Sequence, residues 1–279
     1  MTKKEIIALL NKDLEDEHGA IIQYLSHAYA MGEGEMACEI EAIAREEMRH
    51  LDWLAEAITE LGGTPSLKRG TMIMTGKAVS QWMKNNVMLE EGAIAQYKEH
   101  IKLIPDGKVK RTLARILSDE QSHRGDFAHF VDKSKREGAK DQRGSKQSKV
   151  TKILDWGIEH EYTVVLQYLL HSYLANDEEI KQELQDQAVN EMQHMGWLAE
   201  EMVGSGGNPR MEHSTVAKPA KVVDMLKADI KVEKQVALQY GNAAKEVSDA
   251  GLKKLLTRIR DHENYHVDVF NDLLKKAKQ

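Results

Sequence analysis

The feature that most constrains the fold is a spacing that occurs four times in the chain. Each copy begins with a glutamate that Gln-Tyr follows six and seven residues later, and a Glu-x-x-His motif starts 30 residues after that glutamate. The first glutamates are Glu17, Glu90, Glu161 and Glu233, and the motifs are Glu47/His50, Glu120/His123, Glu191/His194 and Glu263/His266. Four equal spacings indicate one structural unit that is repeated four times.

A longer repeat groups the four copies into two halves. The segment from His50 to Leu67 is similar to the segment from His194 to Met211, at an offset of 144 residues. A polar stretch between them, residues 136–149, has no apolar periodicity and is typical of a linker. We therefore predict two domains of one design at 1–137 and 149–279, joined by a linker at 138–148.

The segments that carry the motifs have apolar residues at three- and four-residue spacing, which predicts helices. Only four prolines occur among 279 residues, so long helices are allowed. Gly-Gly followed by proline is expected to end the second helix of each half. The predicted helices span 3–31, 35–61, 76–104, 107–136, 149–175, 177–204, 218–247 and 250–277.

The connections between these helices predict how each half is wound. Short connections after the first and third helices make antiparallel hairpins, whereas a middle connection of about 14 residues can run the length of a helix. We therefore predict an all-α protein of two four-helix bundles, each with one long crossover. The expected helix starts are the capping boxes Thr2-x-x-Glu5 and Asn176-x-x-Glu179, then Asp106, and Ser248 or Asp249.

The motifs suit a site for two metal ions in each half. Positions i and i+3 of a helix lie about 60° apart, so the Glu and His of Glu-x-x-His point into one cavity. Two such helices and two single-glutamate helices supply four carboxylates and two imidazoles, a set by which helical bundles hold two metals. Two divalent cations would neutralise the four carboxylates, which would otherwise repel one another in a core. These donors suit iron or manganese, and zinc is an alternative.

The helices resemble those of the ferritin-like superfamily, and bacterioferritins above all. Two segments carry this resemblance, EHGAIIQYLSHAY (Glu17 to Tyr29) and EEMRHLDWLAE (Glu46 to Glu56), and it extends over nearly all of both halves. It implies two di-iron centres that oxidise Fe(II) with dioxygen or hydrogen peroxide. It also implies that Glu47, Glu120, Glu191 and Glu263 bridge the metals, that Glu17, Glu90, Glu161 and Glu233 are terminal ligands, and that His50, His123, His194 and His266 each bind one metal.

The two halves differ at the residue before each bridging glutamate. In the resembling family, a carboxylate there orients a metal-bound histidine on the partner helix. The first half has Glu46 and Asp119 at these positions, and the second half has Asn190 and His262. We therefore predict that the second site binds metal more weakly or turns over more slowly.

Other recurring residues have two interpretations each. The tyrosines lie two helical turns past the terminal glutamates, where they either hydrogen-bond a ligand or pass an electron, or simply fill the core. Two methionines stand where bacterioferritins bind haem, but packing is the favoured role and haem is not expected. These residues are Tyr24, Tyr97, Tyr168 and Tyr240, and Met48 and Met192. Histidines recur ten residues after three of the terminal glutamates, at His27, His100 and His171, with no ligand role expected because the fourth copy has Ala243.

One cysteine, Cys38, excludes a cysteine-based iron–sulfur or zinc site and is expected to be a small buried residue. Rubrerythrins, which are peroxide-reducing relatives, carry an additional glutamate three residues after a terminal ligand. This chain has Ala20, Ala93, Val164 and Val236 there, which argues against a conventional rubrerythrin.

The remaining expectations concern partners and alternatives. A formal charge of −6 with both signs interspersed predicts neither nucleic-acid nor membrane binding, and the short first apolar run predicts a cytoplasmic protein. We expect a monomer or small homo-oligomer without a storage shell, and the residues identify no electron donor. Two alternatives to iron oxidation are a peroxide-reducing or manganese-dependent oxidoreductase and a non-catalytic metal-binding module.

Overall fold

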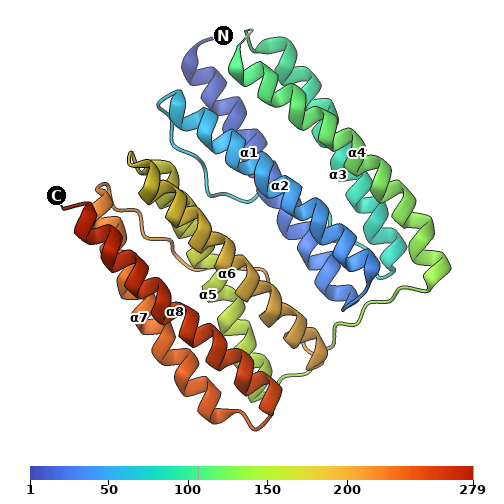
Figure 1. The fold of residues 1–279 in the computed structure, drawn as a ribbon. Helices are drawn as coiled ribbons and strands as arrows, with labels where there is room; N and C mark the ends of the chain where they lie inside the picture. Colours follow the sequence, from blue (N-terminus) through green and yellow to red (C-terminus); the bar gives the residue numbers. More distant parts are fainter. Residues whose placement is uncertain (106, 279) are drawn as a thin grey trace. The chain divides into compact units, whose positions relative to one another are not determined.

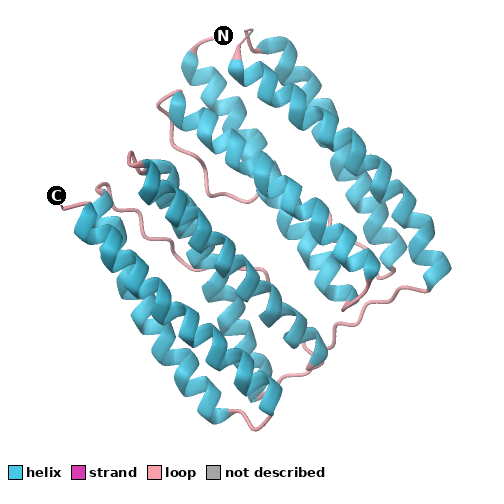
Figure 2. Cartoon of the chain, in the orientation of Figure 1, coloured by secondary structure: helices cyan, strands magenta, loops and turns pink. Residues whose placement is uncertain are grey.

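The computed structural model describes residues 1–105 and 107–278, and all regular secondary structure in these ranges is α-helical (Figures 1 and 2). The chain divides into two compact units, Met1–Gly144 and Ser145–Gln279. The described residues of each unit form four helices. The prediction of an all-α chain with two four-helix bundles is therefore confirmed. No helix in the described ranges has an apolar stretch long enough to cross a membrane.

The first unit consists of α1 (Lys3–Met31), α2 (Glu35–Glu60), α3 (Val79–Leu103) and α4 (Lys108–Glu137). Short connections join α1 to α2 and α3 to α4, and each pair packs as a hairpin. Helix α1 also contacts α3, and α2 contacts α4. Tyr24 bonds to Glu90 while Tyr97 bonds to Glu17, so α1 and α3 are antiparallel.

The second unit repeats this arrangement with α5 (Lys149–Leu174), α6 (Glu178–Gly204), α7 (Val222–Glu246) and α8 (Ala250–Lys276). The hairpins are α5–α6 and α7–α8, and α5 packs on α7 and α6 on α8 (Figure 1). The core between them contains Tyr168, Leu184, Leu226 and Phe270, all fully buried. The same packing in both units places equivalent residues of the two halves in equivalent positions.

Of the four helix starts predicted from capping residues, two are found, one is wrong and one lies outside the described residues. Thr2 and Glu5 form the predicted capping box of α1, and Asp249 caps α8 by accepting from the Leu252 N–H. Helix α6 is capped by Asp177, not by Asn176, because the Asp177 carboxylate accepts from two backbone N–H groups of the first turn. A carboxylate there also interacts favourably with the helix dipole. Asp106 lies outside the described residues.

The two crossovers are longer than predicted, because α3 and α7 begin later than their apolar pattern suggests. They run over 61–78 and 205–221. Before α3, Gly76 has φ of +92°, which turns the chain aside, and its carbonyl accepts from Trp82 Nε1 at 3.1 Å. Before α7, Lys218 precedes Pro219, and proline disfavours the helical conformation in the residue before it.

The first crossover passes close to α1 at a pair of glycines. The Gly70 N–H donates to the Glu15 carbonyl at 2.6 Å, and Gly19 faces the Gly70 backbone. A Cβ on Gly70 would lie 2.6 Å from the same carbonyl oxygen, so only glycine fits there. This contact holds the middle of the crossover against the helix that carries Glu17.

Two glutamines that the sequence left without a role attach the crossovers to the helices. Gln23 accepts from the Ile73 N–H and donates to Asn86 on α3. In the second unit, Gln167 accepts from the Ala217 N–H and donates to Asp229 on α7. Each glutamine thus connects two helices and the crossover between them.

Candidate metal centres

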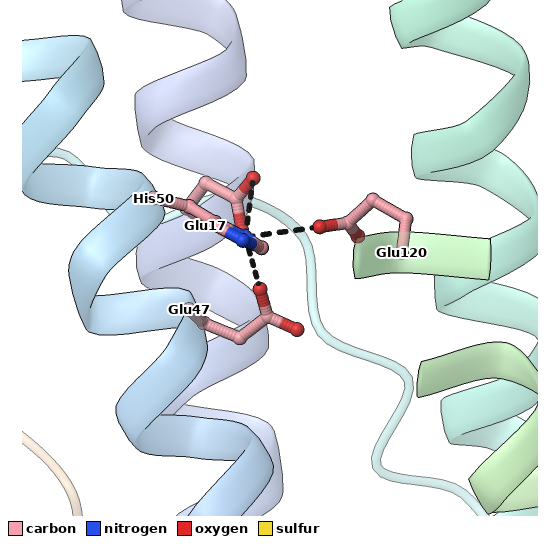
Figure 3. Close-up of side chains that lie close together, drawn as sticks. All are labelled: Glu17, Glu47, His50 and Glu120. Carbon is pink, nitrogen blue, oxygen red and sulfur yellow. Dashed lines mark ion pairs between the residues drawn. The ribbon is translucent and has the colours of Figure 1, made fainter. Parts of the chain in front are cut away.

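Six predicted ligands of the first unit lie together in the core of the bundle. Glu17 comes from α1, Glu90 from α3, and one Glu-x-x-His pair comes from each of α2 and α4. None is more than 4 % exposed. Figure 3 shows the His50 ring between the carboxylates of Glu17, Glu47 and Glu120, which approach it from three different helices.

The two imidazoles present the same atom to the carboxylates. His50 Nδ1 lies 2.7 Å from Glu47 Oε2, 3.0 Å from Glu120 Oε1 and 3.8 Å from Glu17 Oε1. His123 Nδ1 lies 2.9 Å from the other oxygen of Glu47. The carboxylate of Glu47 therefore has one oxygen beside each imidazole.

The ligand atoms form two overlapping groups, in each of which they lie within 4.8 Å of one another. One group contains Glu17 and His50, the other contains Glu90 and His123, and both contain Glu47 and Glu120. This is the arrangement of two adjacent cation sites that share two carboxylates. It has the same division into terminal and shared residues that the ferritin-like resemblance implies.

Several of these buried atoms face only one another as ion-pair neighbours and form no well-oriented hydrogen bond among the described residues. They include both oxygens of Glu47, one oxygen each of Glu90 and Glu120, and Nδ1 of both histidines. Buried polar atoms without partners are costly in a protein core. Lone pairs of oxygen and nitrogen that converge on a common centre fit divalent cations such as iron, manganese or zinc.

The electrostatics of the cluster also favour bound cations. Burial raises the pKa of Glu17, Glu90 and Glu120 well above the usual value, and the neighbouring carboxylates add to this effect. Burial alone would raise the pKa of Glu47 too, but the adjoining His123 and His50 imidazoles lower it to about 2. Positive charge, from protons or from metal ions, is therefore needed to stabilise the cluster.

The second unit builds an equivalent cluster from α5, α6, α7 and α8. Its two groups contain Glu161 with His194 and Glu233 with His266, and both contain Glu191 and Glu263. His194 Nδ1 lies 2.7 Å from Glu191, and His266 Nδ1 lies 2.8 Å from the other oxygen of Glu191. All six side chains are at most 1 % exposed. The structure thus brings together all twelve predicted ligands, six in each unit.

The two units differ in what contacts Nε2 of the cluster histidines, the outer nitrogen that points away from the cluster glutamates. In the first unit, His123 Nε2 lies 2.9 Å from Glu46 Oε2 and His50 Nε2 lies 3.4 Å from Asp119 Oδ2. In the second, His194 Nε2 lies 2.9 Å from Nδ1 of His262. The substitutions noted in the sequence therefore occupy the positions that contact the histidines.

Every one of the four repeated tyrosines donates a hydrogen bond to a terminal glutamate on the facing helix. The pairs are Tyr24 with Glu90, Tyr97 with Glu17, Tyr168 with Glu233, and Tyr240 with Glu161. The tyrosines are at most 2 % exposed. Burial and the nearby carboxylates raise the pKa of Tyr24, Tyr97 and Tyr240, so these hydroxyls keep their protons at neutral pH.

The other singled-out residues lie outside the clusters. Met48 and Met192 are half-buried on α2 and α6. Cys38 is exposed, so the expectation of a buried cysteine is wrong: it falls on the solvent side of α2, between the buried Ala37 and Ile40.

The structure also gives the recurring histidines partners that the sequence reasoning missed. His100 pairs with Asp13 and His171 with Asp229, both at 2.9 Å, while His27 lies 3.0 Å from Asn86. Asp13, Asn86 and Asp229 each lie four residues before a terminal glutamate. In the fourth copy this position is Gly157, and the recurring histidine is replaced by Ala243. This shared four-residue offset is the sequence pattern from which the histidine partners could have been predicted.

Comparison with known proteins agrees with this geometry. A family model described as the ferritin-like domain matches the chain twice, at residues 7–136 and 151–279. The chain belongs to the ferritin-like domain family. Two ferritin-like domains in tandem account for the fourfold spacing, because each domain contains it twice.

Among ferritin-like relatives, the chain is similar to bacterioferritins. It is 34% identical to a bacterioferritin of Desulfovibrio desulfuricans over 127 residues, which cover 43% of this chain and 71% of the relative. A bacterial ferritin of Paramagnetospirillum magnetotacticum is 35% identical over 129 residues, covering 43% and 79%. The solved D. desulfuricans bacterioferritin, described as having a diiron site, matches with a TM-score of 0.46 and 32% identity, covering 48% of this chain and 82% of that one.

Proposed function

We propose that this protein binds two dinuclear iron centres, one in each unit, and oxidises Fe(II) with dioxygen or hydrogen peroxide. The observation that carries the proposal is the buried set of four glutamates and two histidines, found twice, in which several converging atoms have no hydrogen-bond partner in the described chain. The similarity to bacterioferritins supports iron as the metal. Iron handling or defence against oxidants is the proposed role.

The proposed assignment of ligands follows the two overlapping groups. Glu47 and Glu120 would bridge two ions, Glu17 and His50 would complete one, and Glu90 and His123 the other. Glu191 and Glu263 would bridge in the second unit, with Glu161 and His194, and Glu233 and His266, as the outer pairs. Four carboxylates balance two divalent ions, so binding removes the repulsion within each cluster.

The chain's own residues position these ligands. Tyr24, Tyr240 and Tyr168 each hold one oxygen of Glu90, Glu161 and Glu233, and the other oxygen of each glutamate has no hydrogen-bond partner among the described residues. Tyr97 holds one oxygen of Glu17. With metal bound, Nε2 of His123 and of His50 would donate to Glu46 and Asp119, which would leave Nδ1 of both rings free of its proton toward the metal. Burial keeps bulk water from the cluster.

The proposed reaction balances with iron as the reductant. Two Fe(II) ions lose one electron each and become Fe(III). With hydrogen peroxide, the two electrons break the O–O bond and give two hydroxide ions, and with dioxygen they combine with two protons to give hydrogen peroxide. Bound metal supplies this redox chemistry, and the carboxylates compensate the additional positive charge.

The test is an anaerobic Fe(II) titration of metal-free protein, followed by rapid mixing with dioxygen or peroxide while absorbance is recorded. We expect saturation near four irons per chain and an oxo-bridged ferric band. The Glu47→Gln variant removes one shared carboxylate and should lower the stoichiometry to about two, and Glu191→Gln should do the same from the other unit. The exposed Glu60→Gln is the matched control and should still bind about four.

Other outcomes separate the alternatives. Protein expressed without added metal that contains manganese and consumes peroxide would favour manganese chemistry. Bound zinc, with no oxygen consumption when Fe(II) is added, would favour a non-catalytic metal-binding module. Failure to bind any divalent metal would refute the proposal.

A further inference from the structure

We infer that the two centres have different redox preferences: the first stabilises ferric iron, and the second keeps its cations divalent. The inference rests on the proposed function and goes beyond it. It concerns the side chains that contact the outer nitrogens of the metal-binding histidines, not the ligands themselves. These side chains are positioning residues, because they act on a metal only through a histidine.

In the first unit, both histidines donate to carboxylates. Nδ1 of His50 and of His123 faces the glutamate cluster, so a bound cation there requires the ring proton to sit on Nε2. The acceptors of those protons are Asp119 Oδ2 at 3.4 Å and Glu46 Oε2 at 2.9 Å. A carboxylate acceptor makes an imidazole more basic and a stronger donor to the metal.

In the second unit, the Nε2 proton of His194 has a neutral acceptor instead of a carboxylate. Nδ1 of His194 faces the cluster, so its Nε2 carries the proton and donates to Nδ1 of His262 at 2.9 Å. His262 must then accept with a lone pair, and a neutral imidazole attracts the proton less than a carboxylate does. Asn190, which replaces Glu46, instead donates its amide to Gln187 at 3.2 Å.

The cationic side chains around the centres strengthen the difference. In the first unit, Arg49 pairs with Glu46 and Arg115 with Asp119, both at 3.0 Å, so each arginine is neutralised by a carboxylate. In the second unit, Arg258 stands where Arg115 stands, five residues before the shared glutamate. Its guanidinium lies 4.2 Å from the centre of the Trp197 ring, which itself lies 5.6 Å from the ring of His194.

The consequence concerns the one-electron couple Fe(III) + e⁻ ⇌ Fe(II) at each site. Ligands made more basic by carboxylates, with neutralised surroundings, favour the ion of higher charge in the first unit. In the second unit, His194 is a weaker donor to the metal, and Arg258 has a histidine rather than a carboxylate at position 262 beside it. Both features favour the divalent ion. Dioxygen or hydrogen peroxide would therefore oxidise iron in the first unit first, while the second unit holds Fe(II) or zinc.

The test compares the midpoint potentials of the two centres in the full chain. Glu191→Gln leaves the first centre and Glu47→Gln leaves the second, and each variant is loaded with ⁵⁷Fe and poised with mediators while Mössbauer spectra are recorded. At one applied potential, we expect the ferrous-to-ferric ratio to be at least about tenfold higher in the second centre, which corresponds to ~59 mV. Equal potentials would overturn the inference.

A reciprocal exchange tests the responsible residues. In the Glu47→Gln chain, Asn190→Glu with His262→Asp should lower the potential of the second centre toward that of the first. In the Glu191→Gln chain, Glu46→Asn with Asp119→His should raise the potential of the first. A merely structural role for these residues would change iron stoichiometry without moving either potential, and that result would also overturn the inference.

Two further outcomes are distinguishable. If a single-centre variant fails to fold, the unmodified chain poised at a series of potentials should still show two ferric populations that appear in separate steps, and one step would count against the inference. If the unmodified chain binds no iron, the proposed function fails and the inference fails with it. Iron binding and oxidation at two centres of equal potential would remove only the inference.

Discussion

The Tyr97 hydroxyl on α3 donates a hydrogen bond to the Glu17 carboxylate on α1, and both side chains are almost completely buried. The reciprocal bond, from Tyr24 to Glu90, joins the same two helices in the opposite direction. The pair of bonds fixes the antiparallel register of α1 and α3. It also makes each terminal glutamate dependent on a residue of the neighbouring helix.

We expect Tyr97→Phe to weaken metal binding at the position that contains Glu17 and His50. Loss of the hydroxyl frees the carboxylate to rotate, and loss of such an orienting partner typically weakens metal affinity by about 10–100-fold. Isothermal titration with Co(II) or Fe(II) should therefore show one weakened ion in the first unit. Tyr265→Phe is the control, because Tyr265 is 61% exposed and its variant should bind normally. Unchanged affinity in Tyr97→Phe would show that the hydrogen bond does not orient Glu17.

The metal-free protein should lose stability as the pH rises from about 6.5 to 9. Glu47 and other carboxylates raise the pKa of His50 and His123 to about 9 despite their burial. A histidine whose pKa is higher in the folded state stabilises that state fully below its unfolded value, and this contribution disappears as the pH rises through the folded value. The raised pKa values of Glu17, Glu90 and Glu120 act in the same direction.

Thermal unfolding in the presence of a chelator at pH 6, 7.5 and 9 checks this prediction. The midpoint temperature should fall at each step, whereas protein loaded with zinc should change less, because bound metal replaces the protons. A midpoint that rises with pH in the chelated protein would contradict the assigned protonation of the cluster.

Replacing His171 should be more damaging than replacing His27. The His171 ring lies 2.9 Å from the Asp229 carboxyl and 3.0 Å from the Ala217 carbonyl, so both of its nitrogens contact buried polar groups. His171→Ala leaves the Asp229 carboxyl and the Ala217 carbonyl buried without this partner, at a cost of about 1–3 kcal/mol for each group. Burial lowers the pKa of His27 to about 4, so its pair with Asn86 is neutral, and His27→Ala should cost about 1–3 kcal/mol. Urea unfolding of both variants in chelator measures the order, and equal losses of stability would show that the two contacts of His171 are worth no more than the one contact of His27.

Gly70→Ala should destabilise the first unit by about 1–3 kcal/mol or more, because the new Cβ would lie 2.6 Å from the Glu15 carbonyl oxygen and 2.9 Å from the Asp16 Cα. The matched control is Gly125→Ala on α4, where a Cβ meets nothing within 4 Å and alanine favours the helix by about 0.5–1 kcal/mol. Chemical denaturation should therefore move in opposite directions for the two variants. A neutral Gly70→Ala would mean that the crossover can shift away from α1.

The sequence by itself determined the helices, their pairing into two bundles and the residues that gather in each core. Helical periodicity is local, and a spacing of 30 residues between two glutamates repeats only if each copy folds back as the same hairpin. The motif spacing alone therefore places Glu17, Glu47 and His50 in one cavity. The helix ends were predictable within a few residues for the same reason.

Only the tertiary structure decided how distant residues satisfy one another. Gln23 accepts from the Ile73 N–H, and His262 contacts His194, because the backbone paths and side-chain directions bring these residues together. These two contacts join residues 50 and 68 positions apart and leave no periodic pattern in the sequence. Burial then makes each of them consequential, because a polar group that loses water must find its partner in the folded chain.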